Sequence, residues 1–223
     1  MTDQSALFKL LSWLSPNYPV GAFSYSHGLE QAVEARQVTD ARTLESWIET
    51  VLLHGTGRID GPLFREAYYC IEKGDWPGLT EIAELGAAFQ STAEFALESQ
   101  SQGDAFIKAT QNAWPEVALE KLKGGAVYPV AVAVACAAHN IALEDGLTGD
   151  FHAFAANLVS AGVRLVPLGQ SDGQSTLSAL EPIVSASSGN AMSCPLTDMG
   201  SAAPLLDFNS MTHETQYSRL FRS

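Results

Sequence analysis

Residues 40–53, with the sequence DARTLESWIETVLL, decide the fold class of this chain. Their apolar side chains recur every three or four positions, which is the spacing of one face of an α-helix: Leu44, Trp47, Ile48, Val51 and Leu52. Asp40 stands where a residue that caps a helix N-terminus is expected, and two glycines follow the last apolar residue. The stretch therefore predicts an amphipathic helix that buries its apolar face.

The same periodicity continues along most of the chain. Apolar residues at helical spacing occupy residues 7–14, 63–71, 79–96 and 151–166. The segment Val130–Ala135 alternates and could form a strand, but Pro129 suits the first turn of a helix and the flanking patterns are helical, so we expect a helix. A further helical pattern begins at Leu177, and Pro182 is expected to bend or break it. The predicted fold class is all-α.

The predicted organisation is one helical-bundle-like domain with a flexible C-terminal arm. Residues 1–184 carry the helical patterns, whereas residues 185–204 are rich in Ser, Ala, Gly and Pro and have no charge pattern. We therefore expect an all-α domain over 1–184, a linker over 185–204 and a C-terminal docking tail over 205–223.

Composition excludes several classes of protein. The chain holds 12 basic against 25 acidic residues, and this net charge of -13 argues against nucleic-acid binding, which needs a basic surface. Three dispersed cysteines without a CxxC pair, and an N-terminus without a basic secretory signal, favour a reducing cytoplasm. The longest apolar run, 126–143, is interrupted by Pro129 and His139, so we expect a buried helix and no membrane span.

Metal-binding and nucleotide-binding motifs are not found. His213 and Glu214 begin like the zinc-protease signature HExxH, but Tyr217 stands where the second histidine is required, and no two histidines share a helix face. The isolated glycines lack the Lys-Ser/Thr pair of a phosphate-binding loop. Ser26 and His27 resemble part of a hydrolase nucleophile motif, so a small serine hydrolase stays open as the alternative function.

Two segments carry side chains that are typical of protein interfaces. Residues 213–223, HETQYSRLFRS, interleave apolar and basic side chains on an otherwise acidic chain: Tyr217, Arg219, Leu220, Phe221 and Arg222. Aromatic and arginine side chains are enriched at binding hot spots, so this segment is predicted to dock a partner; the alternative is that it packs back on its own domain. Residues 18–30, YPVGAFSYSHGLE, form a turn too short to bury all of its large side chains, and some are expected to face a partner.

Three motifs together resemble the UreF family of urease accessory proteins. They are the segment 18–30 quoted above, AGVRLVPLGQ at 161–170, and HETQYSRLFRS at 213–223. The chain departs from the family pattern at Thr212, where relatives often carry Arg, and residues 74–124 match too poorly for any residue-level comparison.

The resemblance implies an all-α homodimer without catalytic activity or a cofactor of its own. It implies a scaffold that joins the accessory protein UreD, also called UreH, to the GTPase UreG for nickel insertion into apo-urease, so that partners handle nickel and GTP. Gly21, Phe23 and Arg219 match positions tied to UreG recruitment, Arg164 matches a basic position linked to partner contact, and the tail is expected to become ordered on binding UreD. The residues predicted to bind partners are Gly21, Phe23, Tyr25, His27, Glu30, Arg164, Tyr217, Arg219, Leu220 and Phe221.

Overall fold

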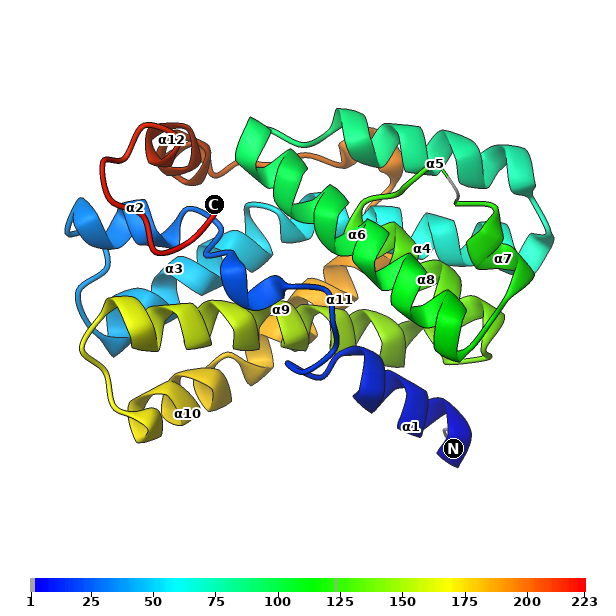
Figure 1. The fold of residues 1–223 in the computed structure, drawn as a ribbon, viewed down its shortest axis with the longest axis horizontal. Coiled ribbons are helices and arrows are strands. Elements are labelled where there is room, and N and C mark those ends of the chain that lie inside the picture. Colours follow the sequence, from blue (N-terminus) through cyan, green and yellow to red (C-terminus); the bar gives the residue numbers. More distant parts are fainter. Residues whose placement is uncertain (1–2, 123) are drawn as a thin grey trace.

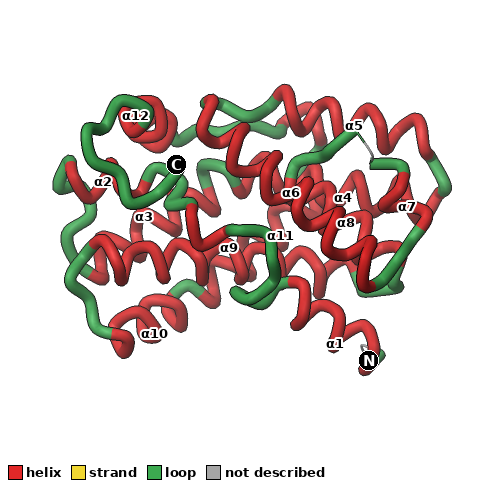
Figure 2. The backbone as a smooth tube through the Cα atoms, in the orientation of Figure 1, coloured by secondary structure: helices red, strands yellow, loops and turns green. Residues whose placement is uncertain are grey.

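A computed structural model describes residues 3–122 and 124–223, and every regular element within these ranges is a helix (Figures 1 and 2). The all-α prediction is therefore confirmed. The elements are α1 (Gln4–Trp13), the 3₁₀ turn η1 (Ala22–Ser24), α2 (Leu29–Glu34), α3 (Ala41–Leu53), α4 (Gly57–Lys73), α5 (Trp76–Ala88), α6 (Ala93–Ala113), α7 (Val117–Glu120), α8 (Tyr128–Ala138), α9 (Leu143–Leu165), α10 (Gln170–Ala179), α11 (Glu181–Ser193), the 3₁₀ turn η2 (Leu196–Asp198) and α12 (Pro204–His213).

Helix α3 forms as its sequence predicts. The Asp40 carboxylate accepts a hydrogen bond from the Thr43 backbone N–H at 2.8 Å, and Thr43 Oγ1 accepts one from the Asp40 N–H at 3.0 Å. This reciprocal capping box satisfies backbone donors that have no partner inside the helix. All of its predicted stripe is buried: Leu44, Trp47, Ile48, Val51 and Leu52.

Helix α8 lies at the centre of the core. Every residue from Val130 to Cys136 is fully buried, and α8 packs against α4, α6, α7 and α9. Alanines alternate with valines along it, so neighbouring helices approach closely on all sides, and Pro129 occupies its first turn as expected. The strand alternative for Val130–Ala135 is wrong. No helix in 3–122 or 124–223 is long and apolar enough to cross a membrane.

The predicted linker over 185–204 is wrong in its first half, because α11 continues to Ser193. A Cβ on Gly61 of α4 would lie 2.4 Å from the Ala191 Cβ, so only glycine lets the two helices pack at this distance. The Arg65 guanidinium then donates to the carbonyls of Ala191 and Cys194, each at 2.7 Å. The small residues that resembled a linker are those that allow this close packing.

Two other boundaries test the sequence patterns. The pattern over 79–96 predicted one helix, but α5 and α6 are separate, because the Thr92 side chain caps a new helix by accepting from the Phe95 N–H at 3.1 Å. The break expected at Pro182 is confirmed, since α10 ends before Leu180 and α11 begins with this proline in its first turn.

Helix α12 brings the C-terminal tail to the segment 18–30. It packs against α2 and α6, far from α1 at the other end of the molecule (Figure 1). The backbone after α12 then passes α2 and runs back toward η1 (Figure 2). Two stretches from opposite ends of the sequence are thereby placed in contact.

Candidate functional site

The tail, residues 213–223, is held against the segment 18–30 by backbone and side-chain hydrogen bonds. The Glu30 carboxylate accepts from the N–H groups of Leu220 at 2.7 Å and Phe221 at 2.9 Å. Beyond them, the Arg222 N–H donates to the Ser24 carbonyl at 2.8 Å. The tail is therefore an ordered part of this structure, and the expectation of a flexible arm does not describe it.

A buried cluster of ionisable groups fixes the start of the tail. The two ring nitrogens of His213 lie 3.1 Å from Glu30 Oε2 and 2.8 Å from Glu94 Oε2, and all three side chains are buried. Burial raises the pKa of Glu94, an effect that its hydrogen bond to His213 and the charge of Arg219 oppose. The ring nitrogens face opposite sides and cannot both ligate one ion. Across 3–122 and 124–223, no group of three or more His, Cys, Asp and Glu side chains is arranged to hold a metal ion.

The segment 18–30 turns sharply because it adopts left-handed backbone conformations. Gly21 and Gly28 both have φ of 75°, and His27 has φ of 55°. Such values favour glycine and are strained for other residues. At Gly28, a Cβ would also lie only 3.4 Å from the Ser210 nitrogen of α12. The turn aims the His27 side chain into the protein.

His27 is a buried structural residue that joins several elements. Its Nδ1 lies 3.2 Å from Glu98 Oε2 and its Nε2 lies 2.7 Å from Thr56 Oγ1. The imidazole stacks on Phe95, with 3.9 Å between the ring centroids, and meets Phe154 of α9 edge-on. Both nitrogens thus have partners within the core.

The geometry contradicts the serine hydrolase alternative. Ser26 is fully buried, and its hydroxyl donates to the Ser223 carbonyl and accepts from the Glu30 N–H at 3.2 Å. His27 pairs with Glu98 and Thr56 and makes no hydrogen bond to Ser26. A serine nucleophile needs a base on its hydroxyl and a path for substrate, and Ser26 has neither.

Comparison with known proteins identifies the family. The UreF family model matches residues 38–181. The chain is 48% identical to a urease accessory protein UreF from Rhodopseudomonas palustris strain BisB5, over 99% of this chain and 93% of that protein. It is also 48% identical to the UreF of Granulibacter bethesdensis, over 100% and 96% of the two chains, and 47% identical to that of a Bradyrhizobium species, over 99% and 93%. This chain belongs to the UreF family.

The family model and the individual relatives match different lengths of this chain. The region matched by the UreF family model, 38–181, runs from α3 into α11 and leaves out both the segment 18–30 and the tail. The similarity to individual UreF proteins covers nearly the whole chain and therefore includes both.

Burial divides the residues that we predicted to bind partners in this UreF-family chain. Exposed positions can meet another protein directly: Phe23, Arg164, Tyr217, Arg219 and Leu220, with Gly21 partly exposed beside them. Buried positions do not reach the surface in this conformation, and their predicted part in partner binding stays a prediction: Tyr25, His27, Glu30 and Phe221. The buried group holds the tail in place. The exposed residues lie either on the tail or on η1 and α9.

The two arginines link the tail to helices α9 and α6. Arg164 donates to the Phe23 carbonyl at 3.1 Å, and its guanidinium lies 4.4 Å from the centroid of the Phe221 ring. Desolvation lowers the pKa of Arg164 below its usual value. Arg219 makes a single hydrogen bond, from NH1 to Glu94 Oε1 at 3.0 Å. Its expected role in UreG recruitment stays a prediction.

Sequence reasoning missed part of this surface. Helix α12 exposes three apolar side chains next to the tail: Leu205, Phe208 and Met211. Their spacing of three residues after Pro204 is the signal in the sequence, but the composition of the region favours a linker and a tail. Sequence reasoning also missed Glu94, which contacts both His213 and Arg219.

Proposed function

We propose that this chain is a non-catalytic urease maturation factor. It serves as a scaffold that joins a UreD/UreH-like protein and the GTPase UreG for GTP-dependent nickel insertion into apo-urease. Membership of the UreF family and the name shared by its relatives, urease accessory protein, support this role. In this proposal the chain acts in the cytoplasm as a homodimer, and nickel and GTP are bound by its partners.

The observation that carries the proposal is the ordered tail. Glu30 fixes the backbone of Leu220 and Phe221, while the side chains of Tyr217 and Leu220 stay exposed. Neither side chain belongs to the hydrophobic core, since Tyr217 is fully exposed and Leu220 is 65% exposed. Held in one conformation, the same pair can bind a partner without the entropy loss of ordering a free segment. The tail surface, defined as Phe23, Tyr217, Arg219 and Leu220, is therefore the proposed docking site.

Binding of the UreD-like partner tests the apolar part of this surface. We expect Tyr217→Ala combined with Leu220→Ala to weaken its binding on the order of a thousandfold, because central apolar anchors carry about 2 kcal/mol or more each and about 1.4 kcal/mol is a factor of ten. The melting temperature should stay unchanged, since both side chains are exposed. Val117→Ala removes an equally exposed apolar side chain elsewhere and is the matched control. Full binding by the double variant would refute the docking site.

Recruitment of the GTPase tests Arg219. Arginine presents a planar pair of donors to a carboxylate that lysine reproduces poorly, so Arg219→Ala and Arg219→Lys should both reduce UreG recruitment and urease activation. Binding of the UreD-like protein should survive, because Leu220 remains. Arg42→Ala, on the exposed side of α3, removes the same charge and is the control. Activation by Arg219→Lys equal to that of the unaltered chain would show that only the charge matters.

Self-association is tested separately. Light scattering at micromolar concentration should give a dimer mass for the purified protein. A mass of 23.8 kDa, that of the single chain, would contradict the dimer without affecting the docking site.

A further inference from the structure

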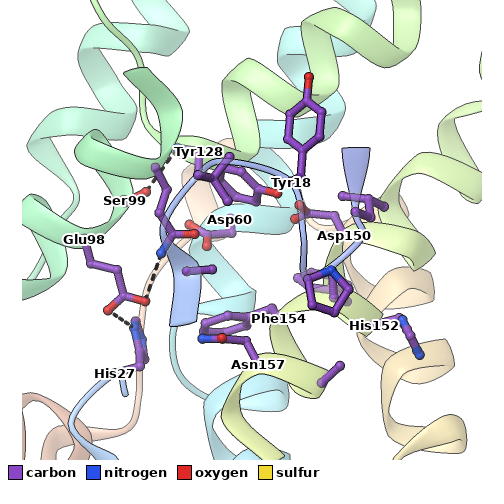
Figure 3. A pocket seen from close by; sticks show the side chains of 18 of the residues that line it. Tyr18, His27, Asp60, Glu98, Ser99, Tyr128, Asp150, His152, Phe154 and Asn157 are labelled. Carbon is purple, nitrogen blue, oxygen red and sulfur yellow. Dashed lines mark hydrogen bonds and ion pairs between the residues drawn. The ribbon is translucent and has the colours of Figure 1, made fainter. Parts of the chain in front are cut away.

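A partly open cavity lies between the loop after α1 and helices α4, α6, α8 and α9. Its volume is about 220 Å³, and its wall combines aromatic side chains with acidic and other polar ones, several of which Figure 3 shows. The aromatic lining residues are Trp13, Tyr18, Phe23, Phe95, Tyr128, Phe151 and Phe154. An engineered apolar cavity of about 150 Å³ holds benzene, so this one has room for a ligand of that size or slightly larger.

The ionisable groups that face the cavity are mostly acidic. Three carboxyl groups line it, those of Asp60, Glu98 and Asp150, together with His27, His152 and the two tyrosines. None of the lining residues is Lys or Arg. Figure 3 shows Glu98 paired with His27, and Ser223 also donates to Glu98 at 2.7 Å. Glu98 is thus satisfied within the protein.

The other two carboxyl groups are not satisfied. The Oδ1 atoms of Asp60 and Asp150 are buried and have no hydrogen-bond partner among the residues that the structure describes. Asp150 is only 5% exposed. Burial raises the pKa of Asp150 to about 7, and burial together with the charges of Asp150 and Glu98 raises the pKa of Asp60 well above its usual value. Buried acceptors without donors are rare in native proteins and indicate a missing partner.

We propose that this cavity binds a small organic cation with N–H donors, of the ammonium or guanidinium class, between Asp60 and Asp150. Its positive charge matches two carboxyl groups that no Lys or Arg neutralises, and its N–H groups supply the donors that both Oδ1 atoms lack. The aromatic walls favour a cation over their ring faces. This inference does not depend on the proposed role in urease maturation.

Other ligand classes fit these walls less well. A metal ion needs several converging ligands, and the described part of the chain holds no such group of His, Cys, Asp and Glu. A neutral apolar molecule would fill the aromatic space but leave both carboxyl oxygens without donors. A cation that lacks N–H groups would match the charge and leave the same acceptors unpaired.

Methylguanidinium is the probe that tests the proposal. We expect saturable binding by calorimetry at low millimolar concentration and a rise in melting temperature, because a ligand of the folded state stabilises it. N-methylurea, which is neutral with similar donors, and tetramethylammonium, which is charged without donors, should not bind. Affinity should increase between about pH 6 and pH 8 as Asp150, with a pKa of about 7, ionises, and binding should release protons.

Two substitutions decide the location. Asp150→Asn and Asp60→Asn keep the side-chain shape and should each weaken binding on the order of tenfold or more, the loss expected for a charge-assisted hydrogen bond. Glu34→Gln, at an exposed position of α2, makes the same charge change outside the cavity and should bind as the unaltered chain does. Circular dichroism confirms that each variant is folded. Absence of saturable binding to the unaltered chain, or binding by the two Asn variants that is as tight as that of the unaltered chain, would overturn the proposal.

Discussion

Replacing Glu30 by Gln is the most direct test of how the tail is held. The Glu30 carboxylate faces three donors or potential donors: the N–H groups of Leu220 and Phe221 at 2.7 and 2.9 Å, and the His213 ring at 3.1 Å. Glutamine keeps one acceptor oxygen and places an NH₂ group where the other stood. That NH₂ group then faces a donor, so at least one charge-assisted hydrogen bond is lost.

The cost can be estimated from the burial of the site. A hydrogen bond to a charged group contributes about 1.5–3 kcal/mol, and Glu30 is only 7% exposed, so solvent screening reduces this little. Losing one or two such bonds should lower the free energy of tail opening by about 2–4 kcal/mol. Because about 1.4 kcal/mol is a tenfold change in an equilibrium constant, the open population should rise roughly 30- to 1000-fold.

Hydrogen exchange measures this population directly. When exchange follows the opening equilibrium, the amides of Leu220 and Phe221 should exchange faster in Glu30→Gln by that factor, while the amides of α8 stay protected. Glu34→Gln, one turn along α2 and exposed, is the matched control and should change neither. Unprotected Leu220 and Phe221 amides in the unaltered chain, or equal exchange in both variants, would refute the anchoring role.

Three further substitutions test other parts of the structure. Gly28→Ala should lower the free energy of unfolding by about 1–2 kcal/mol in denaturant titrations, because its φ of 75° is strained for alanine, whereas Gly189→Ala in open space on α11 should raise it by about 0.5–1 kcal/mol. Asp150→Asn should flatten the pH dependence of the melting temperature. The folded-state pKa of Asp150, about 7, exceeds the unfolded value of about 3.9, so the free energy of unfolding should decrease by up to about 4 kcal/mol as the pH rises from about 3.9 to about 7. An identical slope in the variant would contradict this. Phe221→Ala should weaken packing of the tail on its own domain by about 3 kcal/mol and speed trypsin cleavage at Arg219, because Phe221 is buried. Leu220→Ala changes an exposed side chain and should leave the cleavage rate unchanged. Equal cleavage of the two variants would contradict the burial of Phe221.

The helices could be predicted because their burial has a regular period. The stripe from Leu44 to Leu52 repeats at the period of the helix, and α3 buries all of it. The composition of residues 185–193 carries no such signal. Ser, Ala and Gly suit both a linker and a tightly packed helix, and the choice depends on the contact with Gly61, far away in the sequence.

The candidate site was predictable only at the level of segments. Interface-like residue types marked the tail and the segment 18–30, and the structure places the two in contact. Which side chains are exposed could not be predicted, because the tail is irregular backbone without a period. Leu220 is 65% exposed whereas its neighbour Phe221 is 4% exposed, a difference set by the position of Glu30 and Arg164.

The carboxylate of Glu98 couples two sites thermodynamically, because it contacts both the tail and the cavity. One oxygen receives the Ser223 hydroxyl of the tail, and the same side chain forms part of the cavity wall and acts electrostatically on Asp60. Coupling of this kind is reciprocal: if displacing the tail changes the affinity of the cavity for a cation by about tenfold, a bound cation changes the ease of displacing the tail by the same factor. A protein that captures the tail would then also sense whether the cavity is filled.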